Sequence, residues 1–375
     1  MRVERALVVG AGPAGLSAAI ALLQAGAWTV DIVELTDGDG VIGSELLLAG
    51  PVLRALDALG VADGCAATGV GLERGVHQAM DGRVLAETPF PPAHRGGLPP
   101  AVGISRPALH QILGQRAVEL GGSLRHGVSV TSFENQDDAV AAELTDGTVA
   151  TYDLLVGADG VASRTRTTAL PGAEEPTYVG QAAWRARVAR GDLAPELVVA
   201  YGPHAKPGVI PVSADYAYLF CLVTIPRFER LPRERFPTLL RAALEGFGGP
   251  VGEASQRIGD AEHIHYSPLM PVIVSSPWYD GRCVVIGDAV HATTPHLAFG
   301  AGLAIEDGVV LAEEIATHDT LGDGLASFFA RRYERCRMVV DNGIQLSRWE
   351  QSPDDTEGDS VGLIGESFMA LARPA

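Results

Sequence analysis

The segment that most restricts the possible folds is a glycine-rich stretch near the start of the chain, "GAGPAG" at residues 10–15. An apolar run at 5–9 precedes it, a segment of helical composition at 13–26 begins with proline and ends with glycine, and a second apolar run follows at 28–34. Proline suits the first turn of a helix, and glycine suits its end. The order strand, helix, strand therefore indicates a βαβ unit and an α/β fold with parallel strands.

The glycines of this turn predict a dinucleotide site, with a purely structural turn as the alternative. Gly10, Gly12 and Gly15 have the spacing GxGxxG, which permits a tight turn, close approach of phosphate to backbone N–H groups and close packing of the helix. In a chain with 45 glycines, roughly 0.6 matches to that spacing arise by chance, so context must decide. A second match at 38–43 has no strand directly before it. After the first match, Glu34 ends the next strand, where its carboxylate can accept from the ribose hydroxyls of an adenosine.

The rest of the chain contains a segment of different character. Residues 178–275 are extended and include scattered aromatic residues, which predicts a second domain that contains a sheet. Elsewhere the pattern predicts helices and a hairpin that turns at Asp146-Gly147. The expected elements are a helix at 105–122, extended segments at 128–134, 139–153 and 154–160, a buried strand at 281–289, helices at 302–318 and 325–349, and a loop at 350–360 before a short last helix.

Charge and composition exclude several classes of function. The 375 residues carry a formal net charge of −18, which argues against nucleic acid or an anionic membrane surface as a partner. No apolar run reaches the roughly 18 residues of a membrane span, and an apolar strand begins too early to leave room for an export signal. The four cysteines are far apart with no CxxC pair, so we expect buried, reduced thiols, no metal site and a cytoplasmic protein. Lys206 is the only lysine, and we expect it on a surface loop because it lies in the turn-like "GPHAKPG".

Two further motifs give the chain a specific resemblance. "VGADGVASRTR" (156–166) and "GDAVHATTPHLAFGAGLAIEDGVVLAEEI" (287–315) resemble the DG and GD motifs of class A flavoprotein monooxygenases, the para-hydroxybenzoate and salicylate hydroxylase family. With GAGPAG they stand in that family's order, and the resemblance covers about residues 5–350. It implies an α/β protein with a Rossmann-like FAD-binding domain of the GR2 type, an inserted substrate domain built on a mainly antiparallel β-sheet, and C-terminal helices. The implied boundaries are 1–70, 100–177 and 276–350 for the discontinuous FAD-binding domain, 71–99 and 178–275 for the substrate domain, and 351–375 for a C-terminal tail or helix.

The resemblance also implies an activity. In that family NADH or NADPH reduces FAD, O2 adds to the flavin, and a C4a-hydroperoxide transfers one oxygen atom, so the cofactor carries the chemistry. The chain would then be a single-component monooxygenase, a monomer or homodimer, that hydroxylates or epoxidises an aromatic or other electron-rich small molecule. The main alternative is a reductase or desaturase of the same fold without oxygen insertion. A halogenase would need a WxWxIP segment, which this sequence lacks, and an active-site lysine, for which the expected surface residue Lys206 is no candidate. A non-enzymatic binding protein of this fold would have no use for a GD motif.

Carried over position by position, the resemblance implies cofactor contacts along the chain. Asp288 would accept from the ribityl chain, and Pro295 and His296 would line the flavin. A helix starting near Gly302 would direct unpaired N–H groups and the positive end of its dipole at the flavin edge that gains negative charge on reduction. Many relatives have a basic residue after the strand-end acid, but this chain has Leu35, so one contact on the adenosine side is missing. The expected cofactor residues are Gly10, Gly12, Ala14, Gly15, Glu34, Leu35, Arg106, Val130, Asp159, Gly160, Arg164, Asp288, Pro295, Gly300, Ala301 and Gly302.

Several of these residues have simpler interpretations, which remain open at this point. Asp159 could be a former of the turn at the end of a strand, and Arg106 an exposed basic residue at the start of a helix. Of the two histidines in the GD motif, we expect His291 to cap or pack the turn. His296, beside Pro295, is the one that could touch substrate.

Substrate contacts are expected from the second domain, because alternate residues of an inner strand share one face. The candidates are Arg185, Val209, Pro211, Tyr216, Tyr218 and Phe220. Arg185 could pair with a carboxylate or phenolate of the substrate, or it could form a structural ion pair. Ordinary packing within the sheet is the alternative for the others.

Overall fold

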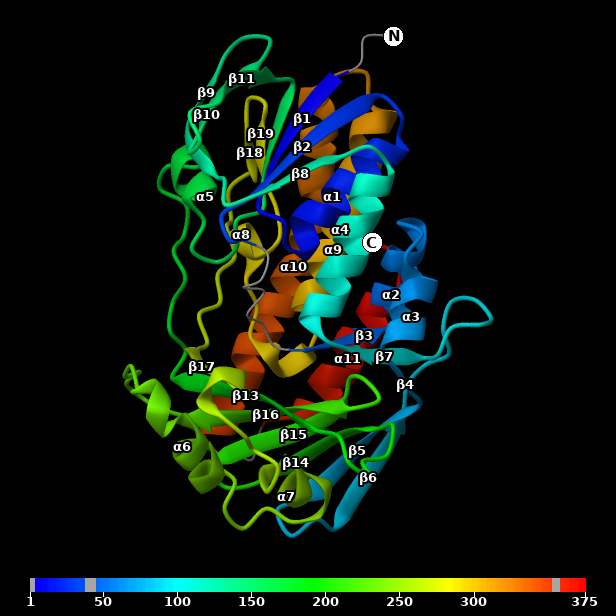
Figure 1. Ribbon diagram of the computed structural model, residues 1–375, viewed down its shortest axis with the longest axis vertical. Coiled ribbons are helices and arrows are strands. Elements are labelled where there is room, and N and C mark those ends of the chain that lie inside the picture. Colours follow the sequence, from blue (N-terminus) through cyan, green and yellow to red (C-terminus); the bar gives the residue numbers. More distant parts are fainter. Residues whose placement is uncertain (1–3, 38–44, 353–357) are drawn as a thin grey trace.

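The computed structural model describes residues 4–37, 45–352 and 358–375, and its first sheet begins with the predicted βαβ unit (Figure 1). β1 (Glu4–Val9) leads through α1 (Pro13–Gln24) into β2 (Trp28–Glu34). β1 pairs in parallel with β2 and, on its other side, with β12 (Leu154–Gly157). The six strands have the order β18-β19-β12-β1-β2-β8, and only the pair β18-β19 is antiparallel. The predicted α/β fold is confirmed. The outer strands are β8 (Ser123–His126), β18 (Tyr279–Asp280) and β19 (Cys283–Val285).

Helices and a small sheet pack on this first sheet and share one apolar core with it. Figure 1 shows α1, α4 and α9 side by side, with the small sheet on the other side of β1. α1 lies so close to α9 that a Cβ on Gly308 of α9 would stand 2.3 Å from the backbone of Ala18. Only glycine fits there. The helices are α4 (Arg106–Glu119), α9 (Gly300–Thr317) and α10 (Leu321–Gln351), and the small sheet holds β9 (Val130–Asn135), β10 (Val140–Leu144) and β11 (Val149–Tyr152) in the order β11-β10-β9.

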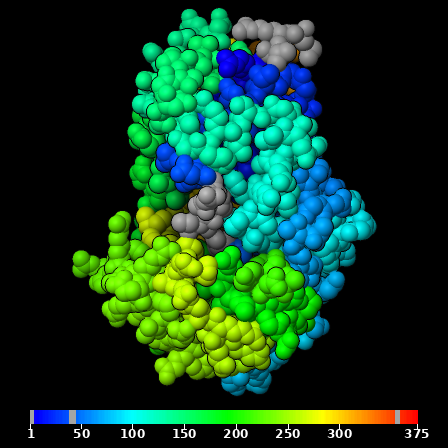
Figure 2. Space-filling model, viewed as in Figure 1, coloured from blue at the N-terminus to red at the C-terminus, as the bar shows by residue number. Residues whose placement is uncertain are grey.

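The second sheet has seven strands and is mainly antiparallel, as predicted. Its order is β17-β13-β16-β15-β14-β5-β6, and only β14 and β5 run parallel. The strands are β5 (Arg74–Ala79), β6 (Val84–Pro89), β13 (Gln181–Ala189), β14 (Leu197–Tyr201), β15 (Ala205–Pro211), β16 (Tyr216–Thr224) and β17 (Ile264–Pro268). They come from both segments assigned above to a substrate domain, although the domain boundaries themselves stay a prediction. Figure 2 shows this part (green to yellow-green) as the lower end of the molecule.

The two faces of the second sheet have different neighbours. One face packs on α6 (Phe236–Ala243) and α7 (Gly249–Ser255), and a core of its own lies between them. The other face meets a three-stranded sheet of order β3-β7-β4 that adjoins the first sheet. At this junction a Cβ on Gly103 of β7 would lie 2.2 Å from the carbonyl of Pro211, so the backbones are in close contact. The three strands are β3 (Leu46–Ala49), β4 (Val70–Leu72) and β7 (Ala101–Ile104).

Shorter helices complete the fold, and several predicted boundaries move. The buried strand expected at 281–289 is limited to β19, because the chain turns at Gly287, with φ of +65°, and α8 begins at Asp288. The helices expected at 302–318 and 325–349 are α9 and α10, which begin at Gly300 and Leu321. The second GxGxxG match at 38–43 and part of the expected loop at 350–360 lie outside the described residues. In the described part of the chain, no helix is long and apolar enough to cross a bilayer. The remaining helices are α2 (Gly50–Ala58), α3 (Ala62–Thr68), α5 (Arg164–Ala169), α8 (Asp288–His291) and α11 (Ser360–Ala372).

Candidate functional site

The three glycines at the junction of β1 and α1 have different roles, and Gly15 lies within the first turn of α1. Gly10 has φ of +102°, and a Cβ there would lie 2.4 Å from the carbonyl of Ala158. A Cβ on Gly15 would lie 1.9 Å from the carbonyl of Gly10. Gly12 faces open space, with no atom within 4 Å of a built Cβ. Gly10 and Gly15 are therefore needed for packing within the protein, whereas Gly12 keeps free the space in front of α1, where a phosphate group can reach the backbone.

The N-terminus of α1 suits an anion. No side chain caps it at Gly12, Pro13 begins the helix, and the first turn carries no acidic residue. The N–H groups of the first turn, that of Ala14 among them, have no partner within the helix, and the helix dipole adds partial positive charge at this end. A pyrophosphate would accept hydrogen bonds from these N–H groups and would be attracted by the positive end of the helix dipole.

Glu34 lies beside this turn at the end of β2. One carboxylate oxygen accepts from the N–H of Ala11 at 2.9 Å, and the other accepts from the N–H and hydroxyl of Thr36 at 3.0 and 2.9 Å. Burial alone raises the pKa of Glu34, but these bonds outweigh it and hold the pKa below its usual value. The carboxylate is thus ionised and fixed in direction, and its remaining lone pairs can accept from a ribose. The neighbouring Leu35, which stands where many relatives have a basic residue, is 68% exposed.

Two histidines that sequence reasoning missed lie next to Glu34. His126 of β8 is the register partner of Glu34 across the parallel strands. The ring centroid of His110 on α4 is 6.4 Å from that of His126. Burial and the neighbouring His126 lower the pKa of His110. No motif could have indicated either residue, because the pairing of β2 with β8 brings His126 to Glu34 and the packing of α4 brings His110 there.

The DG motif holds its own backbone in place. The carboxylate of Asp159 accepts from the hydroxyl of Ser163, from the N–H groups of Arg164 and Thr165 at 2.9 and 3.0 Å, and from the hydroxyl of Thr165 at 3.1 Å. Asp159 therefore fixes the start of α5, as its simpler interpretation expects. Gly160 has φ of +81° and open space around a built Cβ.

Arg166 connects the DG motif to the GD motif, a role that the sequence did not reveal. Its guanidinium is buried and donates to the carbonyls of Ala289 at 2.8 Å and Val161 at 3.1 Å. Its Nη2 also donates to the carboxylate of Glu175 at 2.9 Å.

The GD motif presents one acid outwards. Gly287 adopts φ of +65°, which favours glycine, and Asp288 begins α8 with its side chain exposed. In the part of the chain that the structure describes, no group bonds to the Asp288 carboxylate. It is thus available to a ligand hydroxyl, the role that the resemblance implies.

His291 of the same motif belongs to a fully buried ionic network. Its Nε2 lies 2.5 Å from Asp307, which also accepts from the N–H of Gly287 at 2.8 Å and from Arg332 at 2.8 Å. Burial alone lowers the pKa of His291, but Asp307 raises it well above the usual value, so the ring is an imidazolium. As expected, His291 packs the turn.

His291, Asp307 and Cys336 have potential metal-ligand atoms within 4.8 Å of one another. The guanidinium of Arg332 already lies among them, 2.8 Å from Asp307 and 3.7 Å from the sulfur of Cys336. Its fixed positive charge, next to the protonated His291 ring, disfavours a metal ion there. We interpret the group as an ionic network that holds the GD motif against α9 and α10.

The loop between the GD motif and α9 carries backbone strain. Pro295–Leu297 form one 3-10 turn, and Ala298 follows with φ of +50°, the only positive φ of a non-glycine residue in the described ranges. Such a conformation costs about 1–2 kcal/mol and clusters at functional sites. α9 then begins without a side-chain cap or an acid in its first turn, so the N–H groups of Gly300, Ala301 and Gly302 have no capping side chain.

Arg106 and Val130, two further expected cofactor residues, lie at the ends of elements. Arg106 is the half-buried first residue of α4, after the capping Ser105, which accepts from the N–H of Ala108 at 3.3 Å. Val130 is the first residue of β9, and its side chain packs against the main core.

Lys206 does not lie on a surface loop, which corrects the expectation above. It is the second residue of β15, its side chain is 18% exposed, and it forms an ion pair with Glu350 near the end of α10. The turn-like "GPHAKPG" is overridden because it pairs with β16 across the sheet, Lys206 opposite Leu222. The other carboxylate oxygen of Glu350 lies 3.1 Å from Nε2 of the buried His296.

The candidate substrate residues divide between the two faces of the second sheet. Tyr218 belongs to the cluster that packs towards β4 and β7, and its ring lies 5.5 Å from that of Phe220. Val209 belongs to the core under α6 and α7. Pro211, two residues along the strand, lies on the same face as Val209 because alternate residues share a face. Val209 and Pro211 therefore cannot line a site together with Tyr218, which corrects that part of the expected set. Tyr216 is 46% exposed and stacks with Arg187.

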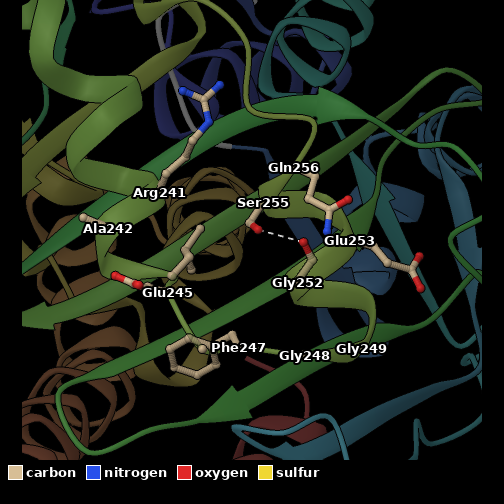
Figure 3. Close-up of a pocket in the computed structure, with 12 residues that line it drawn as sticks. Arg241, Ala242, Glu245, Phe247, Gly248, Gly249, Gly252, Glu253, Ser255 and Gln256 are labelled. Carbon is tan, nitrogen blue, oxygen red and sulfur yellow. Dashed lines mark hydrogen bonds between the residues drawn. The ribbon is translucent and has the colours of Figure 1, made fainter.

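A surface groove on the helix-covered side of the second sheet is separate from all these residues. Figure 3 shows Arg241, Ala242 and Glu245 from α6 and its end facing Gly252, Glu253 and Ser255 of α7, with Phe247 in the turn. It lies on the face of the sheet opposite Tyr218.

Comparison with known proteins agrees with this geometry. The family model described as "FAD binding domain" matches residues 4–343. The chain is 28% identical to aurachin C monooxygenase/isomerase of Stigmatella aurantiaca over 92% of this chain and 90% of that protein. It is 30% identical to 3-amino-4-hydroxybenzoate 2-monooxygenase PtmB3 of Streptomyces platensis over 89% and 84%. The crystal structure of Klebsiella pneumoniae HpxO with FAD and uric acid superposes with a TM-score of 0.85 at 25% identity, over 98% of this chain and 97% of that one.

The residues also fit FAD, the cofactor in the HpxO structure. Gly12 leaves open space, α1 and α9 begin without caps, and the carboxylates of Glu34 and Asp288 can accept from ribose and ribityl hydroxyls. Together, the fold, the three motifs and the family match place the chain in the FAD-binding-domain family, and it is an FAD-dependent monooxygenase of class A.

Proposed function

We propose that this monooxygenase inserts oxygen into an aromatic or nitrogen-heterocyclic small molecule held between the second sheet and the loop before α9. The main support is a row of three residues that lie side by side on neighbouring strands of the sheet. Arg185 of β13 pairs with Phe220 of β16, and Phe220 pairs with Gly208 of β15. Directly opposite residues of antiparallel strands share a face. The row therefore shares its face with Tyr218, two residues from Phe220, and offers a cation, an aromatic ring and a position without a side chain.

Each member of this row has a matching task. The Phe220 ring lies over Gly208, where a built Cβ would be 2.3 Å from its Cζ, so any larger residue would displace the ring. Arg185 is half-buried and donates from Nη1 to Ser267 Oγ at 2.6 Å. That bond fixes the guanidinium and leaves its other donors for a carboxylate, phenolate or ring carbonyl of a substrate.

The relatives support an electron-rich ring as the substrate. One is named for an aminohydroxybenzoate, and the superposed HpxO structure contains uric acid. Bound FAD, reduced by NADH or NADPH, supplies the electrons and the activation of O2. The chain itself supplies orientation of the ring, exclusion of water and a positive helix end at the flavin.

We also propose the cofactor contacts set out above, with two changes of role. Asp159 acts through the start of α5, because its carboxylate is already used there. Leu35 can contact the adenine only through its exposed apolar side chain. We further infer a cytoplasmic location from the four buried cysteines, none of which forms a disulfide.

The test is NAD(P)H oxidation by the purified holoprotein with a panel of phenols, aromatic acids and nitrogen heterocycles, followed by product masses. The expected hit yields a product one oxygen atom heavier. A product that has gained or lost two hydrogen atoms would instead support the reductase or desaturase alternative.

Arg185→Ala tests the proposed substrate face. We expect the apparent KM of the hit to rise about tenfold or more, since a charge-assisted hydrogen bond is worth about 1.5–3 kcal/mol, with unchanged FAD content. Arg227→Ala, at an exposed position, is the matched control. Unchanged steady-state kinetics of Arg185→Ala would remove Arg185 from the site.

A further inference from the structure

Three charged or polar side chains from three separate elements meet at one point. His296 comes from the 3-10 turn before α9, Glu350 from the end of α10, and Lys206 from β15 of the second sheet. Glu350 is the centre, with Lys206 on one carboxylate oxygen and His296 on the other. We call these three residues the interdomain triad. It connects the proposed flavin-facing loop to the proposed substrate sheet.

The carboxylate determines the tautomer of His296. An ionised carboxylate only accepts hydrogen bonds, so Nε2 of His296 must carry the proton that is shared with Glu350. Nδ1, 2.9 Å from the hydroxyl of Thr294, then accepts from that hydroxyl. Both ring nitrogens are therefore used within the protein, and the side chain is fully buried. His296 is thus a fixed part of the loop and has no free nitrogen for substrate, unlike the expectation drawn from its sequence position.

The charges within the triad set the ionisation of Glu350 and His296. Burial raises the pKa of Glu350, but His296 and Lys206 outweigh it and hold that pKa at about 2. Burial and the charge of Lys206 lower the pKa of His296, against the opposing effect of Glu350. Among the described residues, His77 of β5 interacts with the charge of Lys206, and Tyr201 of β14 interacts with that of Glu350; the two are hydrogen-bonded to each other at 2.9 Å. At neutral pH the triad holds a cation, an anion and a neutral imidazole.

Further bonds lock the end of α10 to the second sheet beside the triad. Gln181, the first residue of β13, donates to Glu350 at 3.3 Å and accepts from Ser347 at 2.7 Å. Gln351 donates to the carbonyl of Val179 at 2.9 Å. The helix is also close to the loop, since a Cβ on Gly343 would lie 2.5 Å from the hydroxyl oxygen of Thr294. α10 is therefore in direct contact with both the second sheet and the loop before α9.

We propose that Glu350 is a positioning residue for oxygenation: with Lys206 from the substrate sheet, it fixes the His296 tautomer and holds the strained turn 295–298 in its flavin-facing position. This inference rests on the function proposed above for that loop. The strained backbone of Ala298 explains why this turn needs such a bond, because a strained turn keeps its shape only while surrounding bonds over-determine it. Glu350 supplies one such bond to His296, and its ion pair with Lys206 connects that bond to the second sheet.

The first experiment follows the His296 ring by NMR in holoprotein with labelled histidine, assigned by the signal lost in His296→Asn. Lys206→Met removes a positive neighbour and should raise the pKa of His296, whereas Glu350→Gln removes a negative one and should lower it further. Lys206→Arg, which keeps the charge, and Glu366→Gln, at an exposed position of α11, are the matched controls. Shifts in the same direction, or none, would overturn the triad.

The second experiment tests positioning at saturating FAD. For Glu350→Gln we expect a changed flavin absorption spectrum and, on the substrate found by the panel, an about threefold lower yield of oxygenated product per NAD(P)H consumed, with little change in KM. Lys206→Arg should keep the wild-type yield. A wild-type spectrum and yield in Glu350→Gln would overturn the positioning role and leave the oxygenation proposal standing. If no panel member is oxygenated, the NMR result and the spectrum still decide the triad, and it is the proposed function that fails.

Discussion

Gly12→Ala separates cofactor binding from folding. The backbone of Gly12 has φ of −71° and ψ of −178°, which alanine adopts without strain, and a built Cβ meets no atom within 4 Å. The apoprotein should therefore keep its stability, or gain up to about 1 kcal/mol because alanine restricts the unfolded chain. The added methyl group would occupy the space through which a phosphate reaches the backbone.

Gly12→Ala should weaken FAD binding without lowering the stability of the apoprotein. Losing one hydrogen bond to a charged group costs about 1.5–3 kcal/mol, so the Kd for FAD should rise roughly 10- to 100-fold. Gly15→Ala should behave in the opposite way, because its Cβ would lie 1.9 Å from the carbonyl of Gly10. That clash should destabilise the apoprotein by about 2 kcal/mol or more.

Urea unfolding of the apoprotein and a fluorescence titration with FAD measure the two quantities separately. Gly96→Ala is the matched control, because a Cβ there also meets no atom within 4 Å and the residue lies on an exposed loop. If Gly12→Ala binds FAD with wild-type affinity, the space in front of α1 does not hold the pyrophosphate and the reasoning is refuted.

Three further predictions concern the loop and the network around the GD motif. Arg332→Met removes a buried guanidinium that donates to Asp307, Glu306 and the carbonyl of Leu303. It should lower the free energy of unfolding by about 3–5 kcal/mol, measured by urea unfolding, and a loss below about 1 kcal/mol would contradict the network. Gly300→Val would bring a Cβ within 2.8 Å of the hydroxyl oxygen of Thr293 and should lower FAD retention, read as the ratio of flavin to protein absorbance. Normal retention and turnover would refute the role of the start of α9 at the flavin. The raised pKa of His291 contributes stability below its unfolded value of 6.5 that is lost as pH rises through its folded value. Stability should thus fall with pH above about 6.5 more steeply in the wild type than in His291→Gln, and equal slopes would count against the imidazolium.

Local patterns predicted the parts of the fold in which neighbours in sequence are also neighbours in space. The first βαβ unit follows from proline, glycine and two apolar runs, and Glu34 reaches Ala11 because both lie at the same end of adjacent parallel strands. The start of α9 was placed two residues late, since Gly300 and Gly302 read equally well as turn residues.

Positions set by pairing across the chain could not be predicted in this way. Lys206 was expected on a loop because proline and glycine surround it, yet strand pairing with β16 turns the segment into sheet. Val209 was placed with Tyr218, and the observed register puts Val209 opposite Leu219 on the other face. Glu350 had no motif at all. It reaches His296 because α10 packs against the loop before α9, and it reaches Lys206 because α10 extends to the second sheet.

The most direct test of oxygenation is the fate of labelled O2. With purified holoprotein, NAD(P)H, the substrate found by the panel and ¹⁸O2, we predict a product that carries one ¹⁸O atom and none when the label is in water instead. A product without label that has gained or lost two hydrogen atoms, formed at the same rate without O2, would contradict oxygen insertion by this protein.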